Sequence, residues 1–203
     1  MKKAIKNSIV MVAIIAAMVT NANATATLIV GKEKKTMLAL DDVKQGQQLL
    51  IKDVNGIILY KETINATGTY NNLFDLTQLP NGDYFFELNK DVEINVIPFK
   101  VVENRVEFNK SLESKVFKPI LRMEDNRLFV SKFSLNNAPL SLEIHYANNE
   151  ATHKDFELIY SENIDSTSQI FERVYKLMKG NTGDYKVVIK TDGREFTQTV
   201  KMI

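Results

Sequence analysis

Apolar and polar residues alternate through most of the chain, and one alternating segment occurs twice. Gly82-Asp83-Tyr84 and Gly183-Asp184-Tyr185 lie 101 positions apart, and each opens a segment whose apolar residues recur at every second position. Turn aspartates follow at the same distance, at Asp91 and Asp192. Period-two alternation is typical of strands with one buried face. The repeat predicts two copies of one β module, in which glycine supplies a turn, aspartate faces solvent and tyrosine enters the core.

Further strands of the first copy are separated by turn residues. Asn55-Gly56 fits a two-residue turn that needs positive φ at both positions, and Pro80-Asn81-Gly82 fits a second turn. The alternating segments around them lie at 47–53, 57–63, 71–79, 83–88 and 92–101.

The last strand of the first copy changes phase at a proline. Ile94 and Val96 share one face, and the apolar pattern moves to the other face around Pro98. Proline cannot donate a ladder hydrogen bond, so a bulge or an edge strand is expected there. We therefore expect Ile94, Val96 and Pro98 to form an exposed edge that contacts a partner strand.

The second copy repeats this arrangement with longer loops. Segment 170–177 fits either a strand or a short helix, and Asp192-Gly193 is another two-residue turn signal. Short strands with frequent turns predict an all-β fold of two tandem immunoglobulin-like or fibronectin-like β-sandwiches. The first sandwich is expected in residues 25–103 and the second in residues 104–203.

The first 24 residues have the pattern of a secretory signal peptide. Three lysines precede an uncharged apolar run at 9–19, and Ala22-Asn23-Ala24 is a small-x-small cleavage site. The run is shorter than the roughly 20 residues of a bilayer-spanning helix. We expect cleavage after Ala24, export to the periplasm, the outer-membrane surface or the extracellular space, and no transmembrane helix in the mature chain.

Charge and cysteine content narrow the class of protein. Cleavage leaves 23 basic and 25 acidic residues, and this balance argues against nucleic acid as a partner. The sequence has no cysteine, so neither disulfides nor a lipidated cysteine can act in it, and each sandwich must be held by its apolar core.

One stretch resembles a known family. Residues 48–102 contain Asp75-Leu76-Thr77-Gln78-Leu79, then Gly82-Asp83-Tyr84 and a last strand with Lys100. This order resembles the C-terminal sorting domain of the bacterial type IX secretion pathway, a small β-sandwich of exported Bacteroidetes proteins. About the last 25 residues of the second copy share the resemblance, through Gly183-Asp184-Tyr185 and Lys201. The resemblance implies a β-sandwich fold in an exported protein.

Catalytic chemistry finds little support in the sequence. His145 and His153 flank the Asn148-Asn149 turn, and Asp155 would be a third ligand if they held a metal, but surface histidines are far more common than ligands. The carboxylate pairs Asp41-Asp42 and Glu124-Asp125 lie in turns. No nucleophile elbow, phosphate loop or metal-ligand motif occurs. We expect no enzymatic activity, no cofactor and no metal.

Aromatic residues and short motifs bear on glycan binding and on glycan attachment. Tyr84 and Tyr185 recur just after a turn, where a corner tyrosine caps a backbone group with its hydroxyl. Phe85 is expected on the outward face. Asp165-Ser166-Thr167 resembles the short O-glycosylation motif of exported Bacteroidetes proteins, and Asn65-Ala66-Thr67 would be an N-glycan acceptor only in a eukaryote.

Three functions remain open. The first is a non-enzymatic structural or interaction module of the bacterial envelope or extracellular space, which binds a protein partner or an envelope component. The second is a carbohydrate-binding or adhesive module, which predicts exposed aromatic residues in a planar row. The third and weakest is a small hydrolase.

Overall fold

The computed structural model describes residues 26–30, 35–148, 155–165, 168–177 and 183–202. The chain divides into two compact units, Met1–Lys115 and Val116–Ile203. The expected signal peptide, with Ala22 and Ala24, lies outside the described residues. Among the described residues, no helix is both long enough and apolar enough to cross a membrane.

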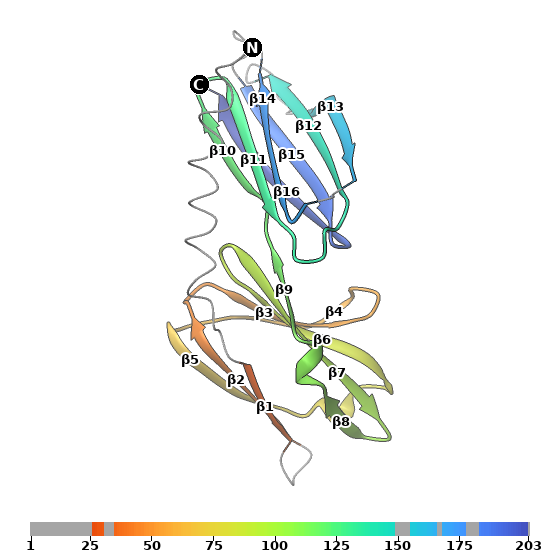
Figure 1. Ribbon diagram of the computed structural model, residues 1–203. Coiled ribbons are helices and arrows are strands. Elements are labelled where there is room, and N and C mark those ends of the chain that lie inside the picture. Colours follow the sequence, from red (N-terminus) through yellow and green to blue (C-terminus); the bar gives the residue numbers. More distant parts are fainter. Residues whose placement is uncertain (1–25, 31–34, 149–154, 166–167, 178–182, 203) are drawn as a thin grey trace. The chain divides into compact units, whose positions relative to one another are not determined.

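The first unit contains two antiparallel sheets (Figure 1). One has the order β1-β2-β5, and the other has the order β4-β3-β6-β7-β8, with β9 also paired to β7. The elements are β1 (Ala26–Val30), β2 (Thr36–Val43), β3 (Gln48–Asp53), β4 (Ile58–Thr63), β5 (Gly68–Phe74), η1 (Leu76–Gln78), β6 (Gly82–Asn89), β7 (Glu93–Val102), β8 (Arg105–Phe108), η2 (Lys110–Leu112) and β9 (Ser114–Phe117).

The core of the first unit lies between these sheets. Alternation puts Leu38 on β2 and Phe86 on β6 among the fully buried side chains, and both belong to one cluster. The rings of Phe74 and Phe86 are 5.3 Å apart and join the two sheets. Burial of each such side chain contributes about 1.5–3 kcal/mol, so the alternating pattern alone accounts for a sandwich.

The second unit has the same construction with fewer strands. Its sheets have the orders β10-β11-β14 and β13-β12-β15-β16. The strands are β10 (Ile120–Glu124), β11 (Arg127–Phe133), β12 (Leu140–Asn148), β13 (Glu157–Ile164), β14 (Ile170–Lys176), β15 (Gly183–Thr191) and β16 (Arg194–Met202). Segment 170–177, which fitted a strand or a helix, is therefore mainly the strand β14.

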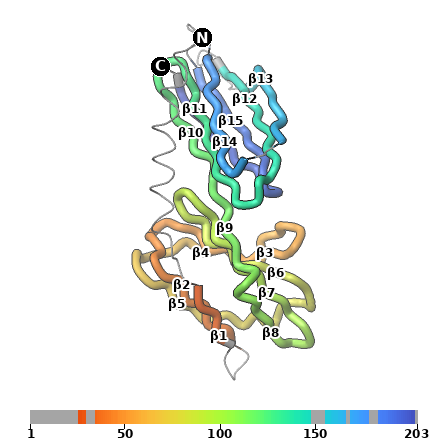
Figure 2. Tube along the Cα trace, in the orientation of Figure 1, coloured from red at the N-terminus to blue at the C-terminus, as the bar shows by residue number. Residues whose placement is uncertain are grey.

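The two units share one strand order (Figure 2). β1 to β7 make the same pairings among themselves as β10 to β16. The pairing of Ile51 with Phe86 corresponds to that of Ile144 with Val187. On their other sides, β3 pairs with β4 and β12 with β13, and each of these two ladders shifts its register just after the isoleucine. The all-β fold predicted from the alternation is confirmed.

The turns agree only in part with their sequence signals. Asp192 and Gly193 have φ of 53° and 67°, which confirms the expected two-residue turn. The same expectation is wrong for Asn55-Gly56, because only Gly56 has positive φ. There the Asp53 carboxylate accepts hydrogen bonds from the backbone NH groups of Asn55 and Ile57, and this side chain sets a longer turn.

The division between the two compact units, after Lys115, lies later in the sequence than the expected sandwich boundary. Glu103 and Asn104, where the sequence suggested a division, both have positive φ and form the turn between β7 and β8. Val102 pairs with Arg105 across this turn, so residues 104–115 belong to the first unit. Turns between paired strands and boundaries between domains are both rich in polar residues. The sequence pattern therefore did not distinguish this turn from a domain boundary.

Candidate functional site

The motif of the first unit is a structural corner. Tyr84 is buried, and its hydroxyl donates a 2.8 Å hydrogen bond to the carbonyl oxygen of Pro80. This confirms the expected corner tyrosine. Asp83 is exposed, as expected. Gly82 does not have positive φ, so it opens β6 without the special turn conformation expected of it.

The corresponding motif of the second unit is more enclosed. Tyr185 is buried with its ring 5.1 Å from that of Tyr146. Asp184 is only 6% exposed, so the expectation that it faces solvent is wrong. Gly183 is needed for close approach, because a Cβ there would lie 2.6 Å from the carbonyl oxygen of Ala147. Both motifs therefore serve the fold.

The expected partner edge at Ile94, Val96 and Pro98 lies inside a sheet. β7 pairs with β6 on one side and with β8 and β9 on the other, so it is not an edge strand among the described residues. Its ladder with β6 continues without a bulge through the pair of Pro98 and Phe85. Ile94 is buried. A strand pattern reveals which residues alternate, but it does not reveal which strands lie at the edge.

Two of the edge strands, β4 and β13, coincide with runs of consecutive exposed apolar residues. Each ends its sheet, and each pairs only with β3 or β12 among the described residues. Three consecutive apolar residues are exposed in each unit, at Ile57-Ile58-Leu59 and Leu158-Ile159-Tyr160, with exposed fractions from 43% to 58%. Exposed apolar edge strands invite pairing with another chain, and proteins normally avoid them. These edges are the strongest candidate for a functional surface.

A cluster of two tyrosines and one glutamate holds each edge strand to the opposite sheet. In the first unit the hydroxyls of Tyr60 and Tyr70 each donate a 2.7 Å hydrogen bond to Glu62. Tyr60 and Glu62 lie on β4, whereas Tyr70 lies on β5. We call these three residues the first clasp. It joins the outer strands of the two sheets on one side of the sandwich.

The second unit has an equivalent clasp. Tyr160 and Tyr175 donate hydrogen bonds of 2.8 and 3.1 Å to Glu162, and their rings are 5.3 Å apart. Glu162 lies on β13 and Tyr175 on β14, again the outer strands of the two sheets. Arg173 lies 3.5 Å from the other carboxylate oxygen and adds an ion pair that the first clasp lacks.

The clasps shift the pKa values of their members. The hydrogen bond to Glu62, with burial, raises the pKa of Tyr60 to about 12. Burial, with the nearby Glu62 or Glu162, raises the pKa of Tyr70 and of Tyr175 well above the usual range. Burial alone would raise the pKa of Glu162, but hydrogen bonds from the two tyrosines and the Arg173 charge outweigh it, so this pKa is lowered. Each clasp is thus built for a carboxylate and two neutral phenols.

Sequence reasoning missed the clasps, although their signal is present. Tyr60-Lys61-Glu62 and Tyr160-Ser161-Glu162 lie 100 positions apart, close to the spacing of the Gly-Asp-Tyr repeat. The exposed triplet Ile57-Ile58-Leu59 lies directly before the first segment, and the triplet Leu158-Ile159-Tyr160 overlaps the second segment at Tyr160. A search for repeats over the whole chain would have found this segment.

The expected candidate ligands do not form a metal site among the described residues. His145 is half-buried on β12 with its Nε2 3.1 Å from a carboxylate oxygen of Glu143. Asp155 is exposed, and His153 lies outside the described residues. Within the described ranges, no group of three or more histidine, aspartate or glutamate residues is placed to hold a metal.

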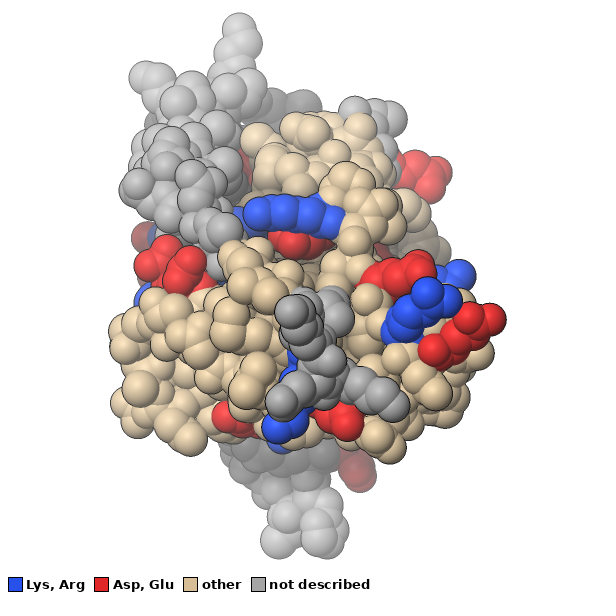
Figure 3. All heavy atoms as spheres, turned by 90° about the horizontal axis from the view of Figure 1, so that it is seen from below, with Lys and Arg blue, Asp and Glu red and all other residues tan. Residues whose placement is uncertain are grey.

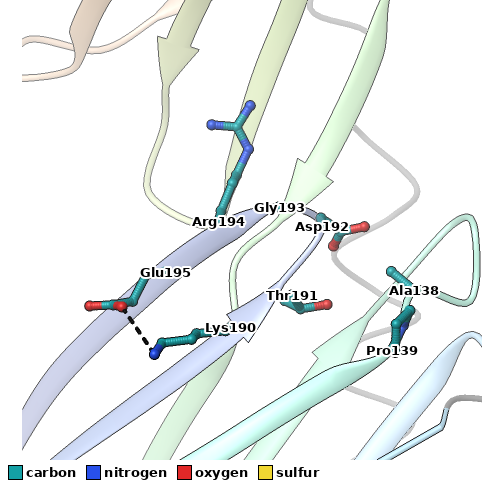
Figure 4. Close-up of a pocket in the computed structure, with 8 residues that line it drawn as sticks. All are labelled: Ala138, Pro139, Lys190, Thr191, Asp192, Gly193, Arg194 and Glu195. Carbon is teal, nitrogen blue, oxygen red and sulfur yellow. Dashed lines mark ion pairs between the residues drawn. The ribbon is translucent and has the colours of Figure 1, made fainter. Parts of the chain in front are cut away.

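The second unit has an open pocket of about 520 Å³ at the β15–β16 hairpin (Figure 4). Lys190 and Glu195 are paired across the hairpin with their charged atoms 3.7 Å apart, and the Asp192 carboxylate lies 2.9 Å from Lys132. The remaining lining residues are Ala138, Pro139, Thr191, Gly193 and Arg194. The described lining contains no histidine, and the carboxylates of Asp192 and Glu195 each pair with a lysine.

Exposed aromatic side chains form no planar row among the residues that the structure describes. Among the exposed large apolar side chains of the described residues, Tyr160 is the single aromatic one, and it is engaged in the second clasp. On the face shown in Figure 3, cationic and anionic side chains form small groups of both signs within an uncharged surface. Among the described residues on that face, no extended basic area of the kind that binds nucleic acid is visible.

Comparisons with known proteins leave the family open. No protein-family model and no curated protein matches the sequence. Among solved structures, a chain described as "Biofilm associated protein - BSP domain" matches with 14% identity and a TM-score of 0.28. The match covers 88% of this chain but only 29% of the other, and at this TM-score it does not bear on fold or function.

Proposed function

We propose that this protein is a non-enzymatic interaction module of the bacterial envelope or extracellular space, which binds a protein partner by adding a strand at a sheet edge. The observation that carries the proposal is the pair of exposed apolar edge strands, β4 and β13. Strand addition gains affinity from main-chain hydrogen bonds and specificity from alternate side chains. Both contributions need a free strand edge, and these two strands provide one.

The clasps support this role because they fix the edges before a partner binds. A rigid edge loses less conformational entropy on association than a mobile one. Tyr60 and Tyr160 reach Glu62 and Glu162 with their side chains, so the outer backbone groups of β4 and β13 stay available. Export rests on the pattern of residues 1–24, and fractionation of cells with a blot for the protein tests it.

Photo-crosslinking in the native cells tests the proposed function. A benzoylphenylalanine is placed at Leu59 or Ile159 on the edges, or at Lys100 or Lys190, which are exposed on the inner strands β7 and β15. We expect specific protein adducts from at least one edge position and none from the two inner-strand positions. Equal adducts from all four positions, or adducts from the inner strands alone, would contradict strand addition.

A further inference from the structure

The two exposed edges differ at one central position. β4 carries Lys61 between Tyr60 and Glu62, whereas β13 carries Ser161 between Tyr160 and Glu162. Lysine on an edge strand is a common way to prevent pairing with another chain, because pairing would desolvate its charge. Both residues are exposed. Lys61 therefore disfavours pairing of β4 with another chain, whereas β13 has no lysine at the equivalent position.

The charge around the two edges also differs. Residues 155–165, which include β13, contain Asp155, Glu157, Glu162 and Asp165 and neither lysine nor arginine. Residues 54–65 around β4 contain one lysine and one glutamate. The second edge is acidic, and the first is electrically balanced.

Contacts among the described residues neutralise only part of this acidic charge. Glu162 is engaged by Tyr160, Tyr175 and Arg173. Asp155, Glu157 and Asp165 are exposed near the two ends of the β13 strand. Lys186 of β15 lies over the ring of Phe156, the residue directly before β13, at 4.9 Å. An exposed apolar centre flanked by carboxylates remains.

We infer that the β13 edge binds an extended protein segment whose apolar residues are flanked by lysine or arginine. This inference rests on the proposed function and adds which edge is used and what kind of segment it accepts. Leu158 and Ile159 contact the apolar residues of the segment, and Glu157 and Asp165 attract its cations. Complementary charge raises the association rate and excludes acidic segments.

Binding of designed peptides to the full chain tests the inference. The probes are a ten-residue peptide of alternating lysine and valine, the same peptide with glutamate in place of lysine, and the lysine peptide with every backbone amide methylated. We expect the lysine peptide to bind at least about tenfold more tightly than the glutamate peptide, a difference of about 1.4 kcal/mol, and to weaken as salt is raised. Methylation should abolish binding, since it removes the NH groups that pair with the strand.

Matched variants locate the binding. Ile159→Lys and Ser161→Lys change exposed residues of β13, and Leu59→Lys makes the same change on β4. The two β13 variants should weaken the lysine peptide at least about tenfold, and Leu59→Lys should leave its affinity within about twofold. Circular dichroism checks that each variant is folded.

The outcomes separate the inference from the proposed function. Equal affinity for the lysine and glutamate peptides, or an equal loss with Leu59→Lys and Ile159→Lys, overturns the inference and leaves strand addition intact. If the methylated peptide binds as tightly as the lysine peptide, charge attraction alone explains the binding. That result overturns both the inference and strand addition. Absence of binding by every peptide overturns both as well.

Discussion

The β6–β7 hairpin of the first unit and the β15–β16 hairpin of the second each carry an ion pair, and the two pairs differ in burial. Asp91 lies 3.1 Å from Lys44, where both side chains are 66% exposed. Asp192 lies 2.9 Å from Lys132, where the side chains are 10% and 2% exposed. The aspartates are 101 positions apart and hold equivalent places in the repeat. The ion pair is thus at the surface in the first unit and part of the interior in the second.

This difference shows which shared features carry stability and which do not. An exposed pair contributes little because water and salt screen it. A buried pair is different, since removal of one partner leaves a charge without compensation. The clasps and the strand order are shared by both units, whereas the environment of the ion pair, the motif glycine and the residue at the centre of the edge strand differ.

The largest contrast is expected from the hairpin aspartates. Asp192→Asn keeps a residue that tolerates positive φ but leaves Lys132 buried without its counter-charge, although Lys132 still donates to the carbonyl oxygen of Phe133. We expect the second unit to lose about 3 kcal/mol. Asp91→Asn should cost the first unit less than about 1 kcal/mol. Native-state hydrogen exchange measures the opening free energy of each unit separately. Equal losses would contradict the contrast in burial.

The motif glycines give the next contrast. In Gly183→Ala the new Cβ would meet the Ala147 carbonyl oxygen at 2.6 Å, and a backbone atom cannot move aside easily. The second unit should lose about 1–3 kcal/mol. In Gly82→Ala the nearest atom is the Tyr84 hydroxyl oxygen at 3.4 Å, so the change should stay within about 0.5 kcal/mol. Thermal unfolding of the two variants measures both effects, and a larger loss for Gly82→Ala would contradict the geometry.

The clasps should behave alike in both units. Tyr70→Phe and Tyr175→Phe each remove one hydrogen bond to a carboxylate and preserve the ring. We expect a loss of about 1.5 kcal/mol in the affected unit for each variant. Hydrogen exchange of β5 or β14 measures the loss. An effect in one unit alone would show that the clasp is not a shared structural element.

The smallest effect concerns alkaline pH. The pKa of Tyr60 is raised to about 12, so the folded first unit binds a proton that the unfolded chain has already released above its ordinary pKa of 10.0. This contribution to stability is complete below pH 10.0 and is lost as pH rises toward about 12. Tyr60→Phe should flatten this decline. Denaturant unfolding from pH 9 to 11.5 measures the decline, and an unchanged slope in the variant would contradict the assignment.

The sequence predicted many of the strands, but it did not predict β1, β2, β8, β9 or β10. Alternation around Tyr84 and Tyr185 predicted the buried faces, because period two leaves little freedom in which side chains face inward. The turn at Asp192-Gly193 followed from the need for positive φ at both positions. These properties depend on neighbours along the chain, which a sequence displays directly.

The candidate site could not be predicted in the same way. β7 looked like an edge because of Pro98, yet β8 and β9 cover it, and β4 looked like an ordinary strand although it ends the sheet. Burial of Asp184 and the approach of Ala147 to Gly183 depend on a neighbouring strand far away in the sequence. Edges and clasps arise from the order of strands in space, which alternation does not encode.

The central claim is that the β13 edge is a surface for strand addition and that β4 is not. Residue-resolved hydrogen exchange of the full chain, with and without the alternating lysine–valine peptide, tests this claim most directly. We expect slower exchange at amides of Glu157–Ile164 on binding and no change at Ile58–Thr63, because a new strand satisfies only the backbone groups that it pairs with. Protection at β4 instead, or protection at neither edge when the peptide is bound, would contradict it.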